Sequence, residues 1–200
     1  MGGKSLNREL FFFIEVLFLV NLLPAFGQQA ASEWNGQGVG LLAKGSYDEA
    51  IQDFNIAIGL NSSYAAAWYN KGLALDDLGK YEEAIQAYNR SIDLKPGLAE
   101  AWSNKGNALN SLGKYSEAIQ VCDKAIELNP NLVEAWNNKG NALNESGRSS
   151  EAIQAYDKAI ELNSSYATAW YNKSLALRAL GRNAEADAAL AKAKELGYKG

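Results

Sequence analysis

Tryptophan recurs along this chain at a constant interval of 34 residues, at Trp34, Trp68, Trp102, Trp136 and Trp170. A fixed period of this length is typical of an array in which every repeat is one supersecondary unit. When each Trp is placed at the fourth position, the units are residues 31–64, 65–98, 99–132, 133–166 and 167–200. One unit cannot bury its own apolar face, so the spacing predicts an elongated stack of units.

Each unit carries the apolar spacing of two helices joined by a turn. In the second unit, Trp68, Gly72 and Leu75 are separated by four and three residues, as on one face of a helix. Gly79 predicts a left-handed end for that helix. A second amphipathic segment follows and ends at Pro96, because Pro disfavours helical geometry at the residue before it. The small residues at positions 8 and 20 of the units predict close approach of the two helices.

The pattern Trp-x-x-Lys-Gly-x-x-Leu…Ala-x-x-x-Tyr…Pro, which runs from Trp68 to Pro96, resembles the tetratricopeptide repeat (TPR). The resemblance spans all five units. It implies an all-α fold, a right-handed α-solenoid of five TPR helical hairpins. Three positions depart from the family pattern, among them position 32, which is Pro in only two units. Position 7, usually Leu, is Lys in four units, and Cys122 replaces an aromatic residue at position 24, where we predict a buried thiol without a chemical role.

Composition excludes several classes of chemistry. The chain has no histidine, so it has no His-based triad and no imidazole metal ligand. It has one cysteine, and no phosphate-binding loop, zinc-protease, nucleophile-elbow or EF-hand motif occurs. The formal net charge of −4 lacks the basic footprint of nucleic-acid binding. We therefore predict no enzyme activity, no catalytic residue, no metal, no cofactor and no nucleic-acid partner.

The N-terminal segment has the layout of a secretory signal peptide. Lys4 and Arg8 precede a largely apolar run over residues 10–23, and small residues stand at positions −3 and −1 of a cut after Gly27. Glu15 interrupts the apolar run, which weakens both a signal peptide and a membrane-spanning anchor.

Three interpretations of this segment stay open. Residues 1–27 are a cleaved signal peptide or, alternatively, a retained membrane anchor over residues 10–27, and residues 28–30 are a short linker to the array at 31–200. Either leading interpretation predicts an extracytoplasmic protein: secreted, periplasmic or at the cell surface. The third is a cytosolic protein with an unusual N-terminus.

The resemblance implies that positions 2, 5, 6, 9 and 12 of the repeats line a concave groove that binds an extended peptide. The residues predicted to form this groove are Tyr69, Asn70, Leu73, Asp76, Glu100, Ser103, Asn104, Asn107, Asn110, Glu134, Asn137, Asn138, Asn141, Tyr171, Asn172, Leu175 and Arg178.

Asparagine dominates this surface, with six side chains of the third and fourth units on one stripe. Asn is a mediocre helix former, and its amide both donates and accepts hydrogen bonds, so the stripe could hold a peptide backbone. The alternative is that repeat duplication copied these residues whatever their use. Asp76, Glu100 and Glu134 outnumber the one basic residue, Arg178, which predicts a neutral or weakly basic segment as the ligand.

The predicted function is a non-catalytic scaffold that binds another protein or an extended peptide segment, with membrane contact only through an uncleaved N-terminus. The alternative is a self-associating structural component or assembly factor of the cell envelope, an end-to-end homo-oligomer. The last helix, expected over 184–196, carries Asp187 and Lys194 in place of Ile, so it could cap the array itself. Asn61 and Asn163, in turns between units, are candidate glycosylation sites if the chain is exported.

Overall fold

The computed structural model describes residues 27–199, and all regular secondary structure within that range is helical. A helix over residues 27–42 is followed by nine others: α2 (Tyr47–Leu60), α3 (Ala65–Asp77), α4 (Tyr81–Leu94), α5 (Ala99–Ser111), α6 (Tyr115–Leu128), α7 (Val133–Glu145), α8 (Ser149–Leu162), α9 (Ala167–Ala179) and α10 (Asn183–Glu195). Residues 28–30, the predicted linker, belong to the first of these helices. Apart from Gly27, the predicted signal peptide or anchor lies outside the described residues. From residue 27 to 199, no helix combines the length and apolar character needed to cross a membrane.

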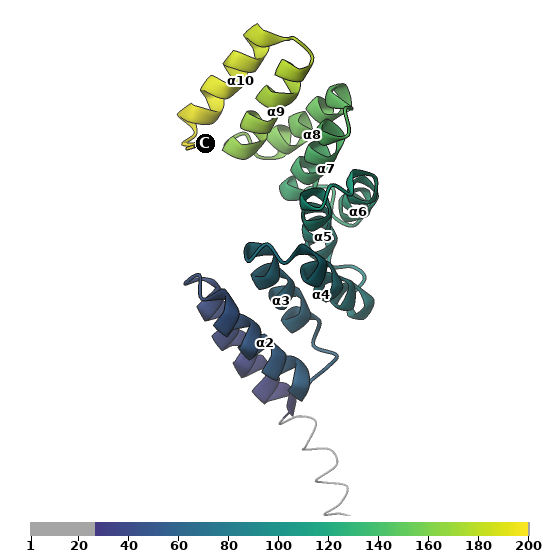
Figure 1. Ribbon diagram of the computed structural model, residues 1–200, viewed down its shortest axis with the longest axis vertical. Helices are drawn as coiled ribbons and strands as arrows, with labels where there is room; N and C mark the ends of the chain where they lie inside the picture. The colour runs from purple at the N-terminus through teal and green to yellow at the C-terminus, as the bar shows by residue number, and fades with distance from the viewer. Residues whose placement is uncertain (1–26, 200) are drawn as a thin grey trace, which may run out of the picture.

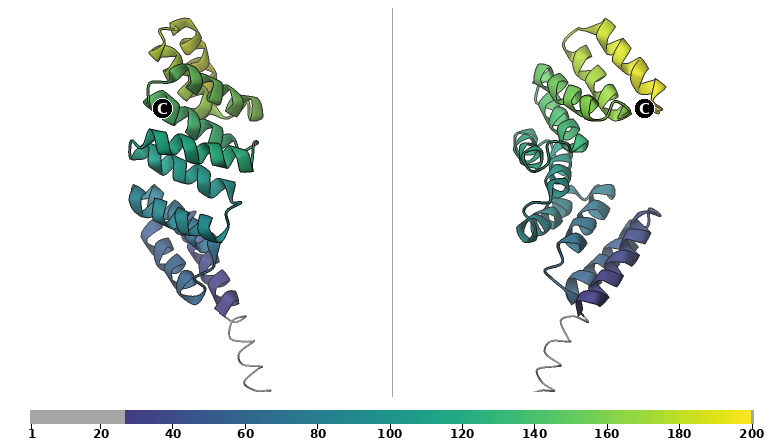
Figure 2. Two further views of the ribbon diagram at one scale, coloured as in Figure 1. Left: turned by 90° about the vertical axis from the view of Figure 1, so that its right-hand side faces the viewer. Right: turned by 180° about the vertical axis from the view of Figure 1, so that it is seen from behind.

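The helices form consecutive antiparallel hairpins that stack into a curved, right-handed α-solenoid (Figure 1). The first helix of each hairpin lies on the inner side of the curve. There α3 contacts α5, α5 contacts α7, and α7 contacts α9. Over the described part of the chain, the backbones of the second helices α4, α6 and α8 do not approach one another as those of the first helices do. Figure 2 shows the same curve from two further sides. The all-α solenoid predicted from the 34-residue spacing is confirmed.

The glycine at position 15 ends the first helix of each hairpin. Gly79 has φ +71°, a left-handed conformation that costs glycine no steric strain. Its N–H donates to the carbonyl of Asp76 and the next N–H, of Lys80, to the carbonyl of Leu75, both at 2.9 Å. These bonds satisfy carbonyls that the helix leaves free at its C-terminus, and they turn the chain sharply into α4.

The glycine at position 8 lets the ring at position 24 pass close to the first helix. A Cβ added to Gly72 would lie 2.5 Å from Cε1 of Tyr88, closer than a real Cβ approaches a ring carbon. The fifth hairpin has Ser174 at position 8 and the flexible Leu190 at position 24 instead. A ring at position 24 thus always has a glycine at position 8; the third hairpin keeps the glycine, Gly106, beside Cys122.

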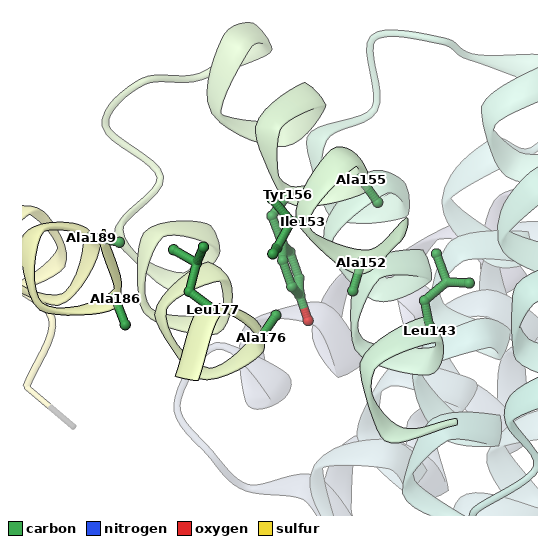
Figure 3. Packing of buried hydrophobic residues seen from close by; sticks show 9 residues of the cluster. All are labelled: Leu143, Ala152, Ile153, Ala155, Tyr156, Ala176, Leu177, Ala186 and Ala189. Atoms are coloured by element: carbon green, nitrogen blue, oxygen red, sulfur yellow. The ribbon is translucent and has the colours of Figure 1, made fainter. Parts of the chain in front are cut away.

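The core runs continuously from hairpin to hairpin because each of the second helices α4, α6 and α8 packs against two first helices. In the C-terminal half, buried residues of α7, α8, α9 and α10 form one cluster around Tyr156, which is 1 % exposed (Figure 3). Its ring lies between Leu143 of α7 and Leu177 of α9. Fully burying an apolar side chain of this size contributes about 1.5–3 kcal/mol. Adjacent hairpins therefore stabilise one another, as expected for a solenoid.

The tryptophans at position 4 are half-buried and join each hairpin to the preceding turn. In the four hairpins after the first, the indole N–H donates to the carbonyl six residues earlier, as from Trp68 to Ser62 at 3.0 Å and from Trp102 to Pro96 at 2.9 Å. Because the acceptor is a backbone oxygen, Pro and Ser serve equally at that turn position. This contact explains why the sequence of the turn varies while the tryptophan recurs.

The lysine at position 7 lies over the tryptophan ring of its own helix. The ammonium is 5.5–5.8 Å from the ring centroid in all four hairpins that carry this lysine. In the last two hairpins it also pairs at 2.6 Å with an aspartate of the preceding hairpin, Lys139 with Asp123 and Lys173 with Asp157. The cation–π contact accounts for a lysine where the family usually has leucine.

Candidate peptide-binding groove

Every residue predicted to line the groove lies on the inner helices α3, α5, α7 and α9. Tyr69 to Asp76 belong to α3, Glu100 to Asn110 to α5, Glu134 to Asn141 to α7, and Tyr171 to Arg178 to α9. Because these helices contact one another in sequence, the predicted residues form one continuous surface.

The asparagines at position 6 link neighbouring hairpins. Each side-chain amide donates to an oxygen of the residue 35 positions earlier, at position 5 of the preceding hairpin. The pairs are Asn70 to Asn35 at 2.9 Å, Asn104 to the Tyr69 hydroxyl at 3.0 Å, Asn138 to the Ser103 hydroxyl at 3.2 Å, and Asn172 to Asn137 at 3.0 Å. Asn137 and Asn138 are buried, 4 % and 8 % exposed.

The remaining asparagines of the stripe are also held within the protein. Asn107 donates to the Asp76 carboxylate at 3.2 Å and Asn110 to the backbone carbonyl of Asn138 at 2.9 Å. Asn141 accepts from the Tyr156 hydroxyl, and Asn144 from the Ser149 hydroxyl, each at 2.9 Å.

These contacts give the stripe a role that sequence reasoning missed, since the amides fix the stacking of hairpins along the inner side. The sequence did carry a signal for it. In the hairpin that precedes each of these asparagines, position 5 is Asn35, Tyr69, Ser103 or Asn137. All four side chains carry an oxygen that can accept a hydrogen bond.

A pocket of about 370 Å³ opens on this surface where α3, α5 and α7 meet. It is lined by Tyr69, Glu100, Ser103, Asn104, Leu132 and Glu134. All but Leu132 were predicted as groove residues from their repeat positions. Leu132 was missed because it is the last residue of its unit, in the turn before α7.

The pocket is electrostatically negative. Burial raises the pKa of Tyr69 most, and Glu100 raises it further; the Asn104 hydrogen bond lowers it, and Glu134 raises it again. The Tyr69 hydroxyl is therefore protonated and neutral at physiological pH, and both carboxylates act on it. Tyr166 lies directly before α9. Burial is the largest cause of its raised pKa, and Glu134 raises that pKa further.

Sequence profiles of the tetratricopeptide repeat match residues 35–99, 99–132, 133–166 and 167–196. The chain belongs to the tetratricopeptide repeat family. Two of the matched segments, 99–132 and 133–166, have the bounds of the third and fourth units set by the tryptophan spacing. No curated protein sequence matches the chain.

Several solved TPR structures are similar to this one. PilF from Pseudomonas aeruginosa is 18% identical with a TM-score of 0.77, covering 87% of this chain and 79% of its own. MamA from Desulfovibrio magneticus RS-1, residues 41 to the end, is 22% identical with a TM-score of 0.73, covering 84% and 94%. YrrB, described as a TPR protein with an unusual peptide-binding site, is 23% identical with a TM-score of 0.63, covering 82% and 84%. At these identities the likeness shows the fold.

Polar atoms at one end of the TPR groove are buried without partners. Within residues 27–199, no hydrogen bond reaches Oδ1 of Asp76, Oδ1 of Asn110 or the hydroxyl of Tyr88. Burial is also the largest cause of the raised pKa of Asp76, followed by the opposing hydrogen bond from Asn107 and the repulsion of Asp77. The buried polar atoms at this end of the groove therefore have fewer hydrogen-bond partners than those around Asn141.

At the other end of the TPR groove, the C-terminal turn packs against α9. The ring of Tyr198 stacks on that of Tyr171, with centroids 4.2 Å apart and planes at 18°. Arg178, the one basic residue predicted in the groove, pairs with Asp187 of α10 at 2.9 Å. None of the large apolar side chains that are exposed lies on α10.

Three other predictions concern a metal site, the thiol of Cys122 and two candidate glycosylation sites. Within the described range, no group of three or more Cys, Asp and Glu residues could hold a metal ion. Cys122 is fully buried, and burial raises its pKa to about 12, so the thiol stays protonated. Asn61 and Asn163 accept backbone hydrogen bonds from Ser63 and Ser165 at 3.0 and 3.1 Å, in turns after α2 and α8.

Proposed function

We propose that this TPR protein is a non-catalytic scaffold that binds an extended segment of a partner protein along its concave face, outside the cytoplasm. The observation that carries the binding site is the pocket lined by Tyr69, Glu100, Ser103, Asn104, Leu132 and Glu134. It lies on the surface predicted from the repeat positions, and three successive inner helices contribute to it.

The asparagine network supports this proposal in a way that differs from direct backbone recognition. Because each position-6 amide bonds to the preceding hairpin, the inner surface is held in one arrangement before a ligand arrives. Preorganisation lowers the entropic cost of binding. The peptide-binding site described for YrrB is a precedent for peptide recognition on the same fold.

The location outside the cytoplasm rests on the signal-like N-terminus, with the membrane anchor over residues 10–27 as the alternative. Sequencing the N-terminus of the native protein tests it. A start at Gln28 is expected after cleavage behind Gly27. An intact N-terminus in the membrane fraction would favour the anchor, and an intact N-terminus in the cytosol would contradict the proposal.

Photo-crosslinking tests the groove. Leu175, 42 % exposed on the inner helix α9, is replaced by p-benzoylphenylalanine in the full-length chain, and Leu94, 37 % exposed at the end of the outer helix α4, is replaced as the matched control. We expect a crosslinked partner only from position 175. Equal crosslinking from both positions, or crosslinking from position 94 alone, would contradict binding in the groove.

A further inference from the structure

We propose that the pocket between α3, α5 and α7 is a subsite for one lysine or arginine side chain of the bound segment. This inference rests on the proposed function and specifies the chemistry of the ligand. It follows from the charge of the pocket, the hydrogen-bonding capacity left in its walls and its size.

Two carboxylates face the pocket from consecutive inner helices. Glu100 and Glu134 occupy position 2 of their hairpins, are both exposed and line the same volume. Across residues 27–199, no lysine or arginine nitrogen lies within 4.0 Å of either carboxylate. Position 2 is Ser32, Ala66 and Thr168 in the other hairpins, so this pair of charges occurs once in the array.

The carboxylates provide most of the hydrogen-bonding capacity of the pocket walls. The amide of Asn104 donates to the Tyr69 hydroxyl, and the Ser103 hydroxyl accepts from Asn138, so the lone pairs of these two hydroxyls are partly used. The four carboxylate oxygens of Glu100 and Glu134 remain available to accept and carry the negative charge of the pocket. An ammonium or guanidinium group matches this surface, because it carries donors and no acceptor.

The apolar part of the pocket suits the stem of the same side chain. Leu132 offers an aliphatic wall, and a lysine or arginine stem can lie on such a surface while its head meets the carboxylates. The ring of Tyr69 provides a further contact for a cation.

The volume indicates one side chain rather than a longer segment. Pockets for small molecules span about 300–1,000 Å³, and this one, at about 370 Å³, falls near the lower limit. The bound segment would lie along the inner helices and place one basic residue in the pocket. A metal ion is a poorer match, since no third acidic or thiol ligand joins the two carboxylates in the described chain.

Binding of short synthetic peptides to the full-length chain tests the subsite. Four acetylated and amidated peptides share one Ser-Ala background and carry Lys, Arg, norleucine or Glu at the central position. Chemical shifts of the Ser103, Asn104 and Glu134 amides report binding at the pocket. The variants are Glu100→Gln, Glu134→Gln and, as a charge-matched control, Glu82→Gln, which changes an exposed carboxylate on α4 outside the pocket.

We expect the Lys and Arg peptides to bind more tightly than the norleucine peptide and to shift the pocket amides. Each pocket variant should weaken their binding by about fivefold, as expected for losing one exposed ion pair, and more salt should do the same. The norleucine peptide should be insensitive to these changes, and Glu82→Gln should leave all four affinities unchanged.

Equal binding of the Lys, Arg and norleucine peptides would overturn the subsite while leaving the groove intact. Absence of any shift at the pocket amides with the Lys and Arg peptides would overturn it as well. Conversely, Lys-selective binding together with crosslinking of the partner from position 94 alone would contradict the proposed function and retain the subsite. The two failures are therefore distinguishable.

Discussion

The hydroxyl of Tyr156 donates to Oδ1 of Asn141 at 2.9 Å, across the hairpin of α7 and α8. Tyr88 occupies the same repeat position in the hairpin of α3 and α4, but Leu73 stands where Asn141 would be. The Tyr88 hydroxyl is consequently buried with no partner among the described residues. Two copies of one repeat position thus differ by a single satisfied hydrogen bond.

This difference predicts opposite effects of one substitution. Tyr156→Phe removes a hydrogen bond and should lower the free energy of unfolding by about 1 kcal/mol. Tyr88→Phe removes a buried polar atom that bonds to nothing and should leave stability unchanged or increase it. Urea unfolding of the full-length variants measures both, and a larger loss for Tyr88→Phe than for Tyr156→Phe would contradict the assignment.

Replacing the Asp76 carboxylate by a neutral amide should increase stability by an amount that depends on pH. Burial raises the pKa of this carboxyl, so the folded protein holds the proton more tightly than the unfolded chain does. The ionised form is disfavoured in the folded state, and this penalty grows as pH rises above the ordinary Asp value. Asp76→Asn should therefore increase the free energy of unfolding at neutral pH by about 1 kcal/mol.

The same gain should shrink as pH falls towards about 4 and be absent below it, where the carboxyl is protonated in both the folded and the unfolded protein. Unfolding curves of both proteins across this range test the sign. Asp77→Asn removes only the repulsion that this exposed neighbour adds, so it should give a smaller gain over the same pH range. A gain from Asp76→Asn that is constant with pH would exclude ionisation as its cause.

The glycines at position 8 predict a steric effect. Gly72→Ala would place a Cβ 2.5 Å from the Tyr88 ring and should cost about 1–3 kcal/mol, because neither helix can move without disturbing its neighbours. Gly40→Ala is the matched control on the helix over residues 27–42, where an added Cβ meets nothing within 4 Å. It should increase stability by about 0.5–1 kcal/mol through helix propensity. Thermal unfolding compares the two, and equal effects would refute the packing argument.

An ion pair missing from the array can be restored. Lys139 and Lys173 each pair with an aspartate 16 residues earlier, but Lys105 has Asn89 at that distance. Burial is the largest cause of the lowered pKa of Lys105, so its charge is incompletely compensated. Asn89→Asp should raise this pKa and stabilise the fold by up to about 1 kcal/mol.

A double-mutant cycle with Lys105→Met isolates the pair. The coupling should decrease at about 1 M salt, where screening is strong. If Asn89→Asp stabilises the chain equally with and without the lysine, the gain does not come from this ion pair.

Much of the fold could be predicted because the same helix-forming and helix-ending residues recur in all five units. Gly79 and its counterparts end helices through their own backbone, and the apolar spacing around Trp68 is a property of one helix. The asparagine contacts could not be predicted in the same way. Whether Asn104 faces a ligand or the Tyr69 hydroxyl depends on the rise and rotation between hairpins, which no single helix determines.

The candidate site shows the same division. Repeat positions place Glu100 and Glu134 on the inner surface, and this could be predicted from the family resemblance. That they share one pocket with Leu132 depends on the angle between α5 and α7, and Leu132 lies in a turn outside the periodic pattern. Likewise, the pairing of Arg178 with Asp187 requires the path of the final turn.

The position-6 amide bonds also determine how the array responds to force. They cross the hairpin junctions on the inner side of the curve, whereas the backbones of the described outer helices α4, α6 and α8 lie further apart. Straightening the solenoid stretches the bonded inner side and must break these contacts, whereas tighter bending compresses the inner side and opens the outer side, where these bonds do not act. The array should therefore resist straightening more than it resists tighter bending. Its inner edge should also be stiffer against extension than that of a stack held by apolar packing alone.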